Sequence, residues 1–204
     1  MLVTGILIAV TVIVSVFGFY NQDAFSRCKF NAYDVRHARQ WYRFFTYGFF
    51  HAGWVHLLVN MFVLYSFALT VEKGFHYYFR SQYVLYFLLL YFGALLLSIL
   101  PAYGKHRNDV FYNAVGASGA VAAIVFANIL LEPDQKIFLF FIPYGIPAPV
   151  FALLYLGYEF YMSKRGRDNI GHDAHFWGAL YGVIFTVAAK PVIFKMFLEQ
   201  LGWM

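Results

Sequence analysis

The stretch Val115-Gly116-Ala117-Ser118-Gly119-Ala120 lies where a short polar loop runs into an apolar helix. A serine between two glycines at the start of a helix has two interpretations. Its hydroxyl can act as a nucleophile when a base removes its proton, or it can simply cap the helix. The motif alone is weak, so its meaning depends on which residues the rest of the chain brings to Ser118.

The composition indicates a protein made of membrane helices. Of the 204 residues, 62% are hydrophobic and 12% are charged, whereas roughly a quarter of the residues in a soluble domain are charged. Several apolar runs approach or exceed the roughly 20 residues that cross a bilayer. We therefore expect an all-α, polytopic membrane protein that forms one domain over residues 1–204. The net charge of +5 is spread over loops and suits anionic lipid headgroups, so no nucleic-acid partner is expected.

Apolar runs bounded by charges, glycine or proline predict six helices. The first run lacks a basic leader and a clear cleavage site, which indicates a retained helix and not a signal peptide. The second and third helices are expected to stop at Glu72-Lys73-Gly74 and at Pro101, because glycine and proline disfavour helix interiors. The expected bounds are residues 2–20, 55–71, 83–100, 118–131, 149–162 and 174–189.

Three other segments have distinct characters. Residues 21–50 carry five Lys and Arg but end in an aromatic run, so part of this loop is expected to lie in the membrane interface as short amphipathic pieces. Residues 141–149 contain three prolines and are expected to be re-entrant or interfacial, since they cannot form a regular helix. The tail after Pro191 is amphipathic. The single Cys28 indicates neither an internal disulfide nor redox chemistry.

Three polar residues are predicted to share one depth in the bundle. His56, Ser118 and His175 lie on three helices that run in the same direction, and each precedes the charged end of its helix by 14–16 residues. At a rise of about 1.5 Å per residue, all three lie ~21–24 Å from one face of a hydrocarbon slab about 30 Å thick. Polar groups at that depth usually face the bundle interior or a water-filled cavity. We therefore expect Ser118 to open into a wet depression.

His175 is the best-placed base for Ser118. Gly178 and Gly182 share a helix face with His175 in a GxxxG pattern, which lets two helix backbones approach closely. No carboxylate is evidently placed to orient the imidazole, because Asp173 lies on a different face. The pattern therefore favours a Ser–His dyad over a triad.

Acyl transfer also needs donors for the developing oxyanion. His56 and Asn60 are four residues apart and share one helix face. Together with the backbone N–H of Ser118 they supply three donors, and the positive end of the helix dipole adds to them.

Other interpretations remain open from the residues alone. His172 and His175, with His51 and His56, would make a plausible zinc set, although no HExxH motif is present. The proline-broken segment at 141–149 would suit a transporter, but no second broken helix matches it. A GxxxG pattern is also more often plain helix packing.

Taken together, the motifs resemble the rhomboid intramembrane serine proteases over about residues 39–182. The resemblance implies a six-transmembrane-helix bundle with a partly membrane-embedded first loop and a hydrated cavity open to the outside. It rests on the order and spacing of Arg43-Phe44-Phe45-Thr46, His51, His56-Leu57-Leu58-Val59-Asn60, Gly116-Ala117-Ser118-Gly119, and His175-Phe176-Trp177-Gly178 with Gly182.

The resemblance also implies roles for these residues. Ser118 matches the nucleophile and His175 the general base, while His56, Asn60 and the Ser118 backbone N–H match the oxyanion hole. The structural and supporting residues that it implies are Arg43 with Trp41 or Tyr42, His51, Gly116, Gly119, Gly178 and Gly182.

Family substrates are single-span membrane proteins within the lipid bilayer, and no metal or cofactor is implied. The helix at 149–162 and the loop before the last helix resemble a lateral gate and cap. The family places such a multi-pass protein in the cell membrane, with its cavity on the extracytoplasmic side. A catalytically silent binder of transmembrane helices is the alternative function.

Two departures from the family pattern stand out. Ala122 occupies a position where an aromatic residue often packs on the imidazole, so either another aromatic residue, such as Phe126 or Phe176, holds His175, or the ring is held more loosely. Ten of the 15 Lys and Arg lie on the loops that the family places outside, whereas the positive-inside rule favours the opposite orientation. Ala117 stands where inactive relatives typically have proline, which favours activity.

Overall fold

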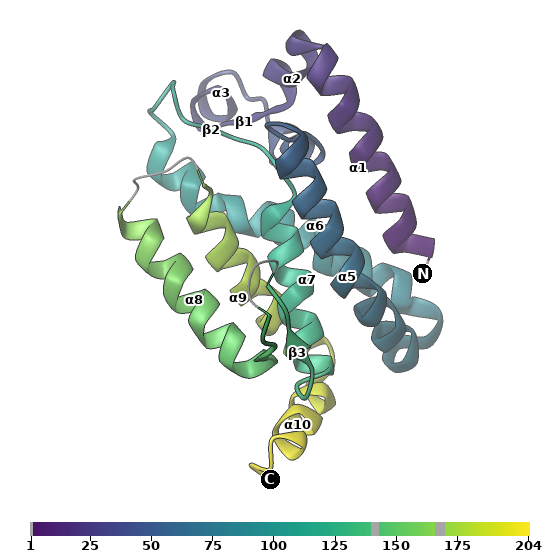
Figure 1. Cartoon of the computed structure of the whole chain (residues 1–204). Coiled ribbons are helices and arrows are strands. Elements are labelled where there is room, and N and C mark those ends of the chain that lie inside the picture. Colours follow the sequence, from purple (N-terminus) through teal and green to yellow (C-terminus); the bar gives the residue numbers. More distant parts are fainter. Residues whose placement is uncertain (1, 140–142, 166–169) are drawn as a thin grey trace.

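Long helices make up most of the chain (Figure 1). The structure is a computed structural model that describes residues 2–139, 143–165 and 170–204. Six helices of 14 to 26 residues correspond to the six predicted runs. They are α1 (Leu2–Tyr20), α5 (Trp54–Phe79), α6 (Tyr83–His106), α7 (Ser118–Leu131), α8 (Ala148–Arg165) and α9 (His172–Ala189).

Helix α7 is the centre of the bundle. Every residue from Gly119 to Leu130 is buried, and α7 contacts α5, α6, α8 and α9, which surround it in Figure 1. A helix that is apolar on all sides is stable only when other elements cover it. Its predicted bounds are confirmed. At about 1.5 Å per residue its 14 residues extend ~21 Å, which is shorter than a hydrocarbon slab of about 30 Å.

Two predicted helix ends are wrong. Helix α5 does not stop at Gly74 but continues to Phe79, and its C-cap, Arg80, has a φ of +53°. A Cβ on Gly74 would lie 2.9 Å from Leu131 Cδ1, so the glycine serves close packing inside the helix. Helix α6 likewise passes through Pro101 and ends at His106, because a proline removes a single helical hydrogen bond that packing can offset.

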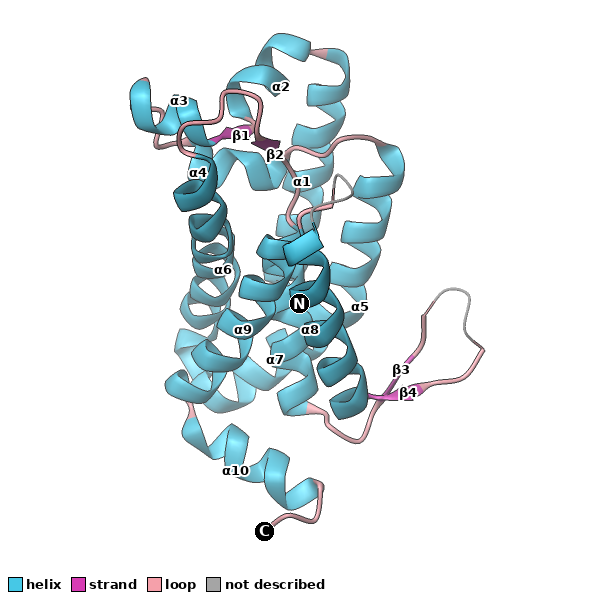
Figure 2. Cartoon of the chain, turned by 90° about the vertical axis from the view of Figure 1, so that its left-hand side faces the viewer, coloured by secondary structure: helices cyan, strands magenta, loops and turns pink. Residues whose placement is uncertain are grey.

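The C-terminal third differs less from the prediction. Helix α8 begins one residue earlier and ends three residues later than expected, and α9 begins two residues earlier. Residues 136–147 contain an unpredicted antiparallel hairpin, β3 (Lys136–Ile137) with β4 (Ile146–Pro147), which projects from the bundle in Figure 2. Part of the proline-rich stretch, residues 141 and 142, lies outside the described residues. The tail forms α10 (Pro191–Gln200), which bends by 107° from α9.

The connection after α1 folds into short pieces, as predicted. Arg43 organises them: its guanidinium is buried, donates to the carbonyls of Ser26 at 2.9 Å and Lys29 at 2.5 Å, and pairs with Asp34 at 3.2 Å. Strand β1 (Phe30–Asn31) pairs with β2 (Asn113–Ala114), which lies just before Ser118. The pieces are α2 (Gln22–Cys28), β1 (Phe30–Asn31), α3 (Ala32–His37), α4 (Arg43–Thr46) and η1 (Tyr47–Phe49); η2 (Arg80–Gln82) and β2 (Asn113–Ala114) follow later.

Among the described residues, length and composition identify two stretches able to cross a membrane. They are Leu2–Tyr20 and Trp54–His106, which contains both α5 and α6; the bent pair α9 and α10 raises the number to three. Helix α7 is apolar but short. The apolar helices therefore mark a membrane protein, while a count of six spans is not confirmed.

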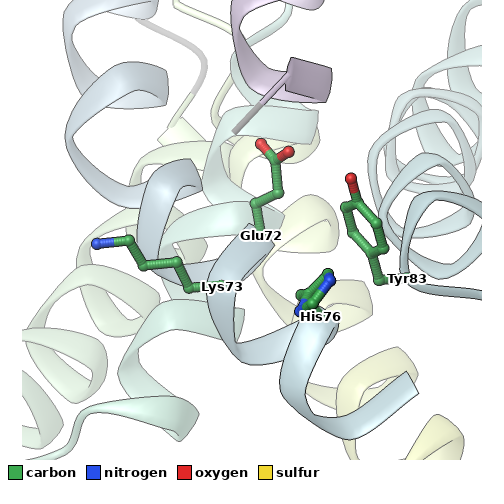
Figure 3. Close-up of a pocket in the computed structure, with 4 residues that line it drawn as sticks. All are labelled: Glu72, Lys73, His76 and Tyr83. Carbon is green, nitrogen blue, oxygen red and sulfur yellow. The ribbon is translucent and has the colours of Figure 1, made fainter. Parts of the chain in front are cut away.

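A buried glutamate fastens the start of α1 to α5. Glu72 is 1% exposed, and its carboxylate accepts hydrogen bonds from the backbone N–H groups of Val3 and Thr4 at 3.2 and 3.1 Å and from the Thr4 hydroxyl at 2.7 Å. Figure 3 shows its side chain pointing toward α1, at a cavity of about 200 Å³ that Tyr83 also lines. Glu72 thus serves as an acceptor for a helix start, two turns before α5 ends.

Candidate active site

Ser118 is the first residue of α7, and its hydroxyl does not cap the helix. The capping position is Ala117, which makes no side-chain cap hydrogen bond. Gly116 has a φ of +113°, and a Cβ there would lie 2.6 Å from His56 Cε1 and 2.8 Å from its Nε2. The loop therefore needs glycine for its backbone conformation and to admit the His56 ring. Because the first N–H groups of a helix have no partner within it, the N–H of Ser118 is a free donor beside this ring.

Two glycines bring α9 directly onto the backbone of α7. A Cβ on Gly178 would overlap the backbone of Gly119, with 2.9 Å to its Cα, and a Cβ on Gly182 would lie 2.7 Å from Ala123 Cα. The predicted GxxxG pattern is thus a close helix contact. A Cβ on Gly119 would in turn lie 3.2 Å from the carbonyl oxygen of Ala174. Gly119 and Ala174, the sequence neighbours of Ser118 and His175, are therefore in contact.

Among the residues that the structure describes, no hydrogen bond joins Ser118 to His175. The serine is half-buried and the imidazole is 17% exposed, so both are reachable from a partly open site. Nucleophile–base hydrogen bonds are often long in a protein without substrate and tighten when substrate binds. The contact of Gly119 with Ala174 brings the start of α7 close to the first turn of α9, which carries His175.

The partner of His175 is a carboxylate that the sequence analysis missed. Glu159 on α8 is 5% exposed. Its Oε1 lies 3.2 Å from His175 Nδ1, and its Oε2 lies 2.5 Å from His172 Nδ1. The expectation that no carboxylate faces His175 is therefore wrong. Glu159 is the single acid within 149–162, and an acid in an apolar helix is itself a signal of a functional site.

The aromatic support predicted for His175 is not found in the described part of the chain. Phe126 packs on Tyr155, with ring centroids 5.5 Å apart, and Phe176 packs on Phe160 at 5.6 Å. The ring contact of His175 is with His172, at 6.2 Å and 76°. With Ala122 at the usual position, the imidazole is held by Glu159 and not by an aromatic face.

The predicted oxyanion donors, His56 and Asn60, both lie on α5, which contacts α7. His56 faces Gly116, and its Nδ1 lies 3.4 Å from the backbone N–H of Ala52, which donates to it. Asn60 is buried, and its side-chain amide donates to the carbonyl of His56 at 2.9 Å. This bond uses one of the two amide protons of Asn60, so the second remains for a ligand.

His51, which packs against His56, is a neutral imidazole. It is fully buried, and burial, with a smaller effect of His56, lowers the pKa of His51 to about 3. The Ser15 hydroxyl donates to the carbonyl of Phe49 at 2.7 Å, so it must accept from His51 Nδ1, 2.8 Å away. His51 then packs edge-on against His56, with centroids 4.9 Å apart. Its position agrees with a structural role.

The remaining predicted residues differ in their setting. Arg43 is buried within the first loop, as described above, while Trp41 is about half exposed and stacks on Phe44 at 6.2 Å. The guanidinium of Arg43 also lies 5.8 Å from the centre of the Tyr42 ring. Arg43 holds the loop together, and Trp41 lies at its surface.

Among the described residues, the four histidines of the alternative zinc set do not form one cluster. The described cluster with suitable spacing is Glu159, His172 and His175, whose donor atoms lie within 4.8 Å of one another. Tetrahedral zinc with bonds of 2.0–2.1 Å separates its ligand atoms by about 3.3 Å, whereas Glu159 Oε2 lies 2.5 Å from His172 Nδ1. The three side chains are therefore arranged to hydrogen-bond one another.

The chain is similar to known proteins. A family model described as the Rhomboid domain matches residues 38–191. Relatives include "RHOMBOID-like protein 12, mitochondrial" of Arabidopsis thaliana, 29% identical over 68% of this chain and 44% of its own length. "Rhomboid-like protein 11, chloroplastic" of the same plant is 31% identical, over 72% and 51%. "Presenilin-associated rhomboid-like protein, mitochondrial" of Homo sapiens is 26% identical, over 72% and 38%.

The chain spans between 38% and 51% of the length of these relatives. The family model covers most of the chain and includes the predicted nucleophile, base and oxyanion donors. It also includes Glu159, which no motif had marked. The chain therefore belongs to the rhomboid family.

Proposed function

We propose that the protein is an intramembrane serine endopeptidase that cuts single-span membrane proteins in or near their transmembrane helices. The observation that carries the proposal is the backbone contact between α7 and α9, which brings the turn containing His175 onto the helix start at Ser118. A serine hydroxyl becomes a useful nucleophile only beside a base. His56 packs against the serine loop at Gly116, and the first N–H groups of α7 have no partner within the helix, so both can donate to an oxyanion.

The chemistry follows from these positions. His175 Nε2 takes the proton of Ser118 while the serine oxygen attacks the peptide carbonyl carbon, and the carbonyl oxygen becomes an oxyanion held by the N–H of Ser118, His56 and Asn60. When the C–N bond breaks, His175 gives its proton to the leaving amine. Water then attacks the acyl-enzyme, again losing its proton to His175, and the carboxylic acid product leaves as Ser118 is restored.

The test uses the purified full-length chain in detergent with a single-span test substrate. Ser118→Ala and His175→Ala are expected to lower kcat by at least about 10³-fold, because the members of a nucleophile–base pair act as a unit. Ser66→Ala and His76→Ala are matched controls, since both side chains are exposed on α5, and should leave kcat unchanged. Full activity in Ser118→Ala would exclude the mechanism. Clients that co-purify without being cut, with no fluorophosphonate labelling of Ser118, would identify a silent binder.

We further propose that the protein lies in the cell membrane with its cavity on the extracytoplasmic side. The charge bias against this orientation is smaller than the count of Lys and Arg implies, because Arg43 is buried and paired with Asp34. Cys28 on α2 lies near the end of the bundle at which β1 pairs with β2. A membrane-impermeant thiol reagent is therefore expected to label Cys28 in intact cells. Labelling only after lysis would reverse the orientation.

A further inference from the structure

Glu159 is a buried charge with a specific arrangement of partners. Each carboxylate oxygen faces one imidazole, Oε2 at 2.5 Å from His172 and Oε1 at 3.2 Å from His175. The phenol of Tyr155, one helical turn earlier, also interacts with it. Of the residues of α8, only Ala148 and Glu159 are buried. Partly buried apolar side chains of α8, among them Phe151 and Leu156, also pack on the bundle, and the polar cluster adds to that contact.

The carboxylate decides which nitrogen of each histidine carries a proton. An ionised carboxylate can only accept hydrogen bonds, so Nδ1 of His172 and Nδ1 of His175 must both be protonated. A neutral His175 then has its lone pair on Nε2. That is the tautomer that a general base needs, because Nε2 is the ring nitrogen left to face Ser118.

Both histidines donate to the carboxylate. The bond to His172 helps to hold Glu159 in place, because a hydrogen bond to an ionised group is stronger than one between neutral groups. The longer bond, to His175, leaves room to tighten when that ring gains a proton from the serine. A carboxylate behind the base stabilises the imidazolium that forms, without itself taking the proton.

We propose that Glu159 is a positioning residue that makes Ser118 and His175 part of a carboxylate-supported triad, and that His172 fixes Glu159 in turn. This inference rests on the proposed function. The support comes from α8, a different helix from those that carry the nucleophile and the base. It replaces the aromatic contact that Ala122 cannot provide, and it makes the docking of α8 on α9 a requirement for full activity.

The kinetic test compares Glu159→Gln with Asp173→Asn. Glu159→Gln is expected to lower kcat by at least about 10²-fold with little change in KM, short of the about 10⁴-fold that loss of a triad carboxylate can cause. Glu159→Asp should restore part of kcat. Asp173→Asn is the matched control, because Asp173 lies on α9 but pairs with Lys105 at 3.8 Å near the surface. Its kcat should not change.

A second set of substitutions changes His172. His172→Leu removes the donor and is expected to lower kcat by about 10-fold, whereas His172→Asn keeps a donor and should retain more activity. A spectroscopic readout separates orientation from folding. In wild-type protein with ¹⁵N-labelled histidine, His175 should show the tautomer with a protonated Nδ1, and Glu159→Gln should reduce its population while thermal unfolding still shows a folded protein.

The outcomes distinguish the two proposals. If Ser118→Ala keeps its activity, the proposed function fails whatever Glu159 does. If Ser118→Ala is inactive but Glu159→Gln keeps both its kcat and the His175 tautomer, only the positioning role fails. Activity lost on adding a chelator and restored by zinc would overturn the hydrogen-bonded assignment and make the three groups metal ligands.

Discussion

Two glutamates are buried in the helices of this protein, and their partners differ in kind. Glu72 on α5 accepts from backbone N–H groups and a hydroxyl at the start of α1, while Glu159 on α8 accepts from two imidazoles. In the sequence Glu72 lies beside Lys73 at a predicted helix end, whereas Glu159 is an acid within an apolar helix, which suggests function. Backbone amides cannot change their protonation state, whereas imidazoles can. The partners therefore separate a structural acid from one that can serve catalysis.

This comparison predicts separate consequences for the two ends of the molecule. Changes at Glu72 should affect the free energy of unfolding and leave each folded molecule active. Changes around Glu159 and the α7–α9 contact should affect turnover. Substitutions at Gly178 and at Glu72 test whether turnover and the free energy of unfolding change separately.

Of the changes at these two ends of the molecule, the larger effect is expected from Gly178→Ala. Its new Cβ would overlap the backbone of Gly119, and backbone cannot rotate away as a side chain can. We expect the added methyl to push α9 off α7 and to lower kcat/KM by at least about 10²-fold, the typical result of a displacement near 1 Å. The free energy of unfolding should also fall by about 1–3 kcal/mol.

Gly157→Ala is the matched control for this change. Gly157 lies inside α8, and a Cβ there meets nothing within 4 Å. Alanine favours a helix by up to about 1 kcal/mol over glycine, so this variant should be at least as stable as the wild type and equally active. Equal activity of Gly178→Ala, measured on the same substrate, would mean that the helix contact does not position the base.

A smaller effect, confined to stability, is expected from Glu72→Ala. The change leaves the donors of Val3 and Thr4 without their acceptor. An unsatisfied buried group costs about 1–3 kcal/mol, so we expect the free energy of unfolding to fall by about 2–4 kcal/mol. Thermal unfolding in detergent measures the loss. Turnover per fluorophosphonate-labelled site should equal that of the wild type.

Two further variants show how much of the stability change at Glu72 comes from a single hydrogen bond and how much any loss of an acid would cause. Thr4→Val removes one donor and keeps the backbone bonds, so about 1 kcal/mol should be lost. Glu132→Ala changes an exposed acid at the end of α7 and should have no effect on unfolding. A drop in turnover per labelled site in Glu72→Ala would show that the far end of α5 contributes to catalysis, and the distinction between the two glutamates would fail.

Much of the fold was predictable from local pattern. The bounds of α7 agree with the prediction, because its apolar run begins after a glycine loop and ends at Glu132. The ends of α5 and α6 were not predictable in this way. Gly74 and Pro101 are weak helix formers, but Gly74 packs against Leu131 and α6 continues for five residues beyond its proline. Tertiary packing outweighs a propensity of a few kcal/mol.

The site was predictable where it depends on spacing along one helix. His175 and Gly178 share a face, and the close contact of α9 with α7 follows from that pattern. The partner of His175 depends on how α8 is rotated against α9, which no spacing within either helix reveals. The available signal was chemical: one acid, Glu159, in an otherwise uncharged stretch.

The contact of Gly178 and Gly182 with the backbone of α7 has a consequence for how this protein can change over evolutionary time. Where two side chains meet, an enlarged residue can be accommodated by a smaller one opposite. Where a glycine meets a backbone, the chain has nothing opposite to shorten, so we expect no second-site suppressor for either position. Variation that alters substrate preference should instead accumulate on α8, whose side chains mostly face outward, provided that Glu159 is kept.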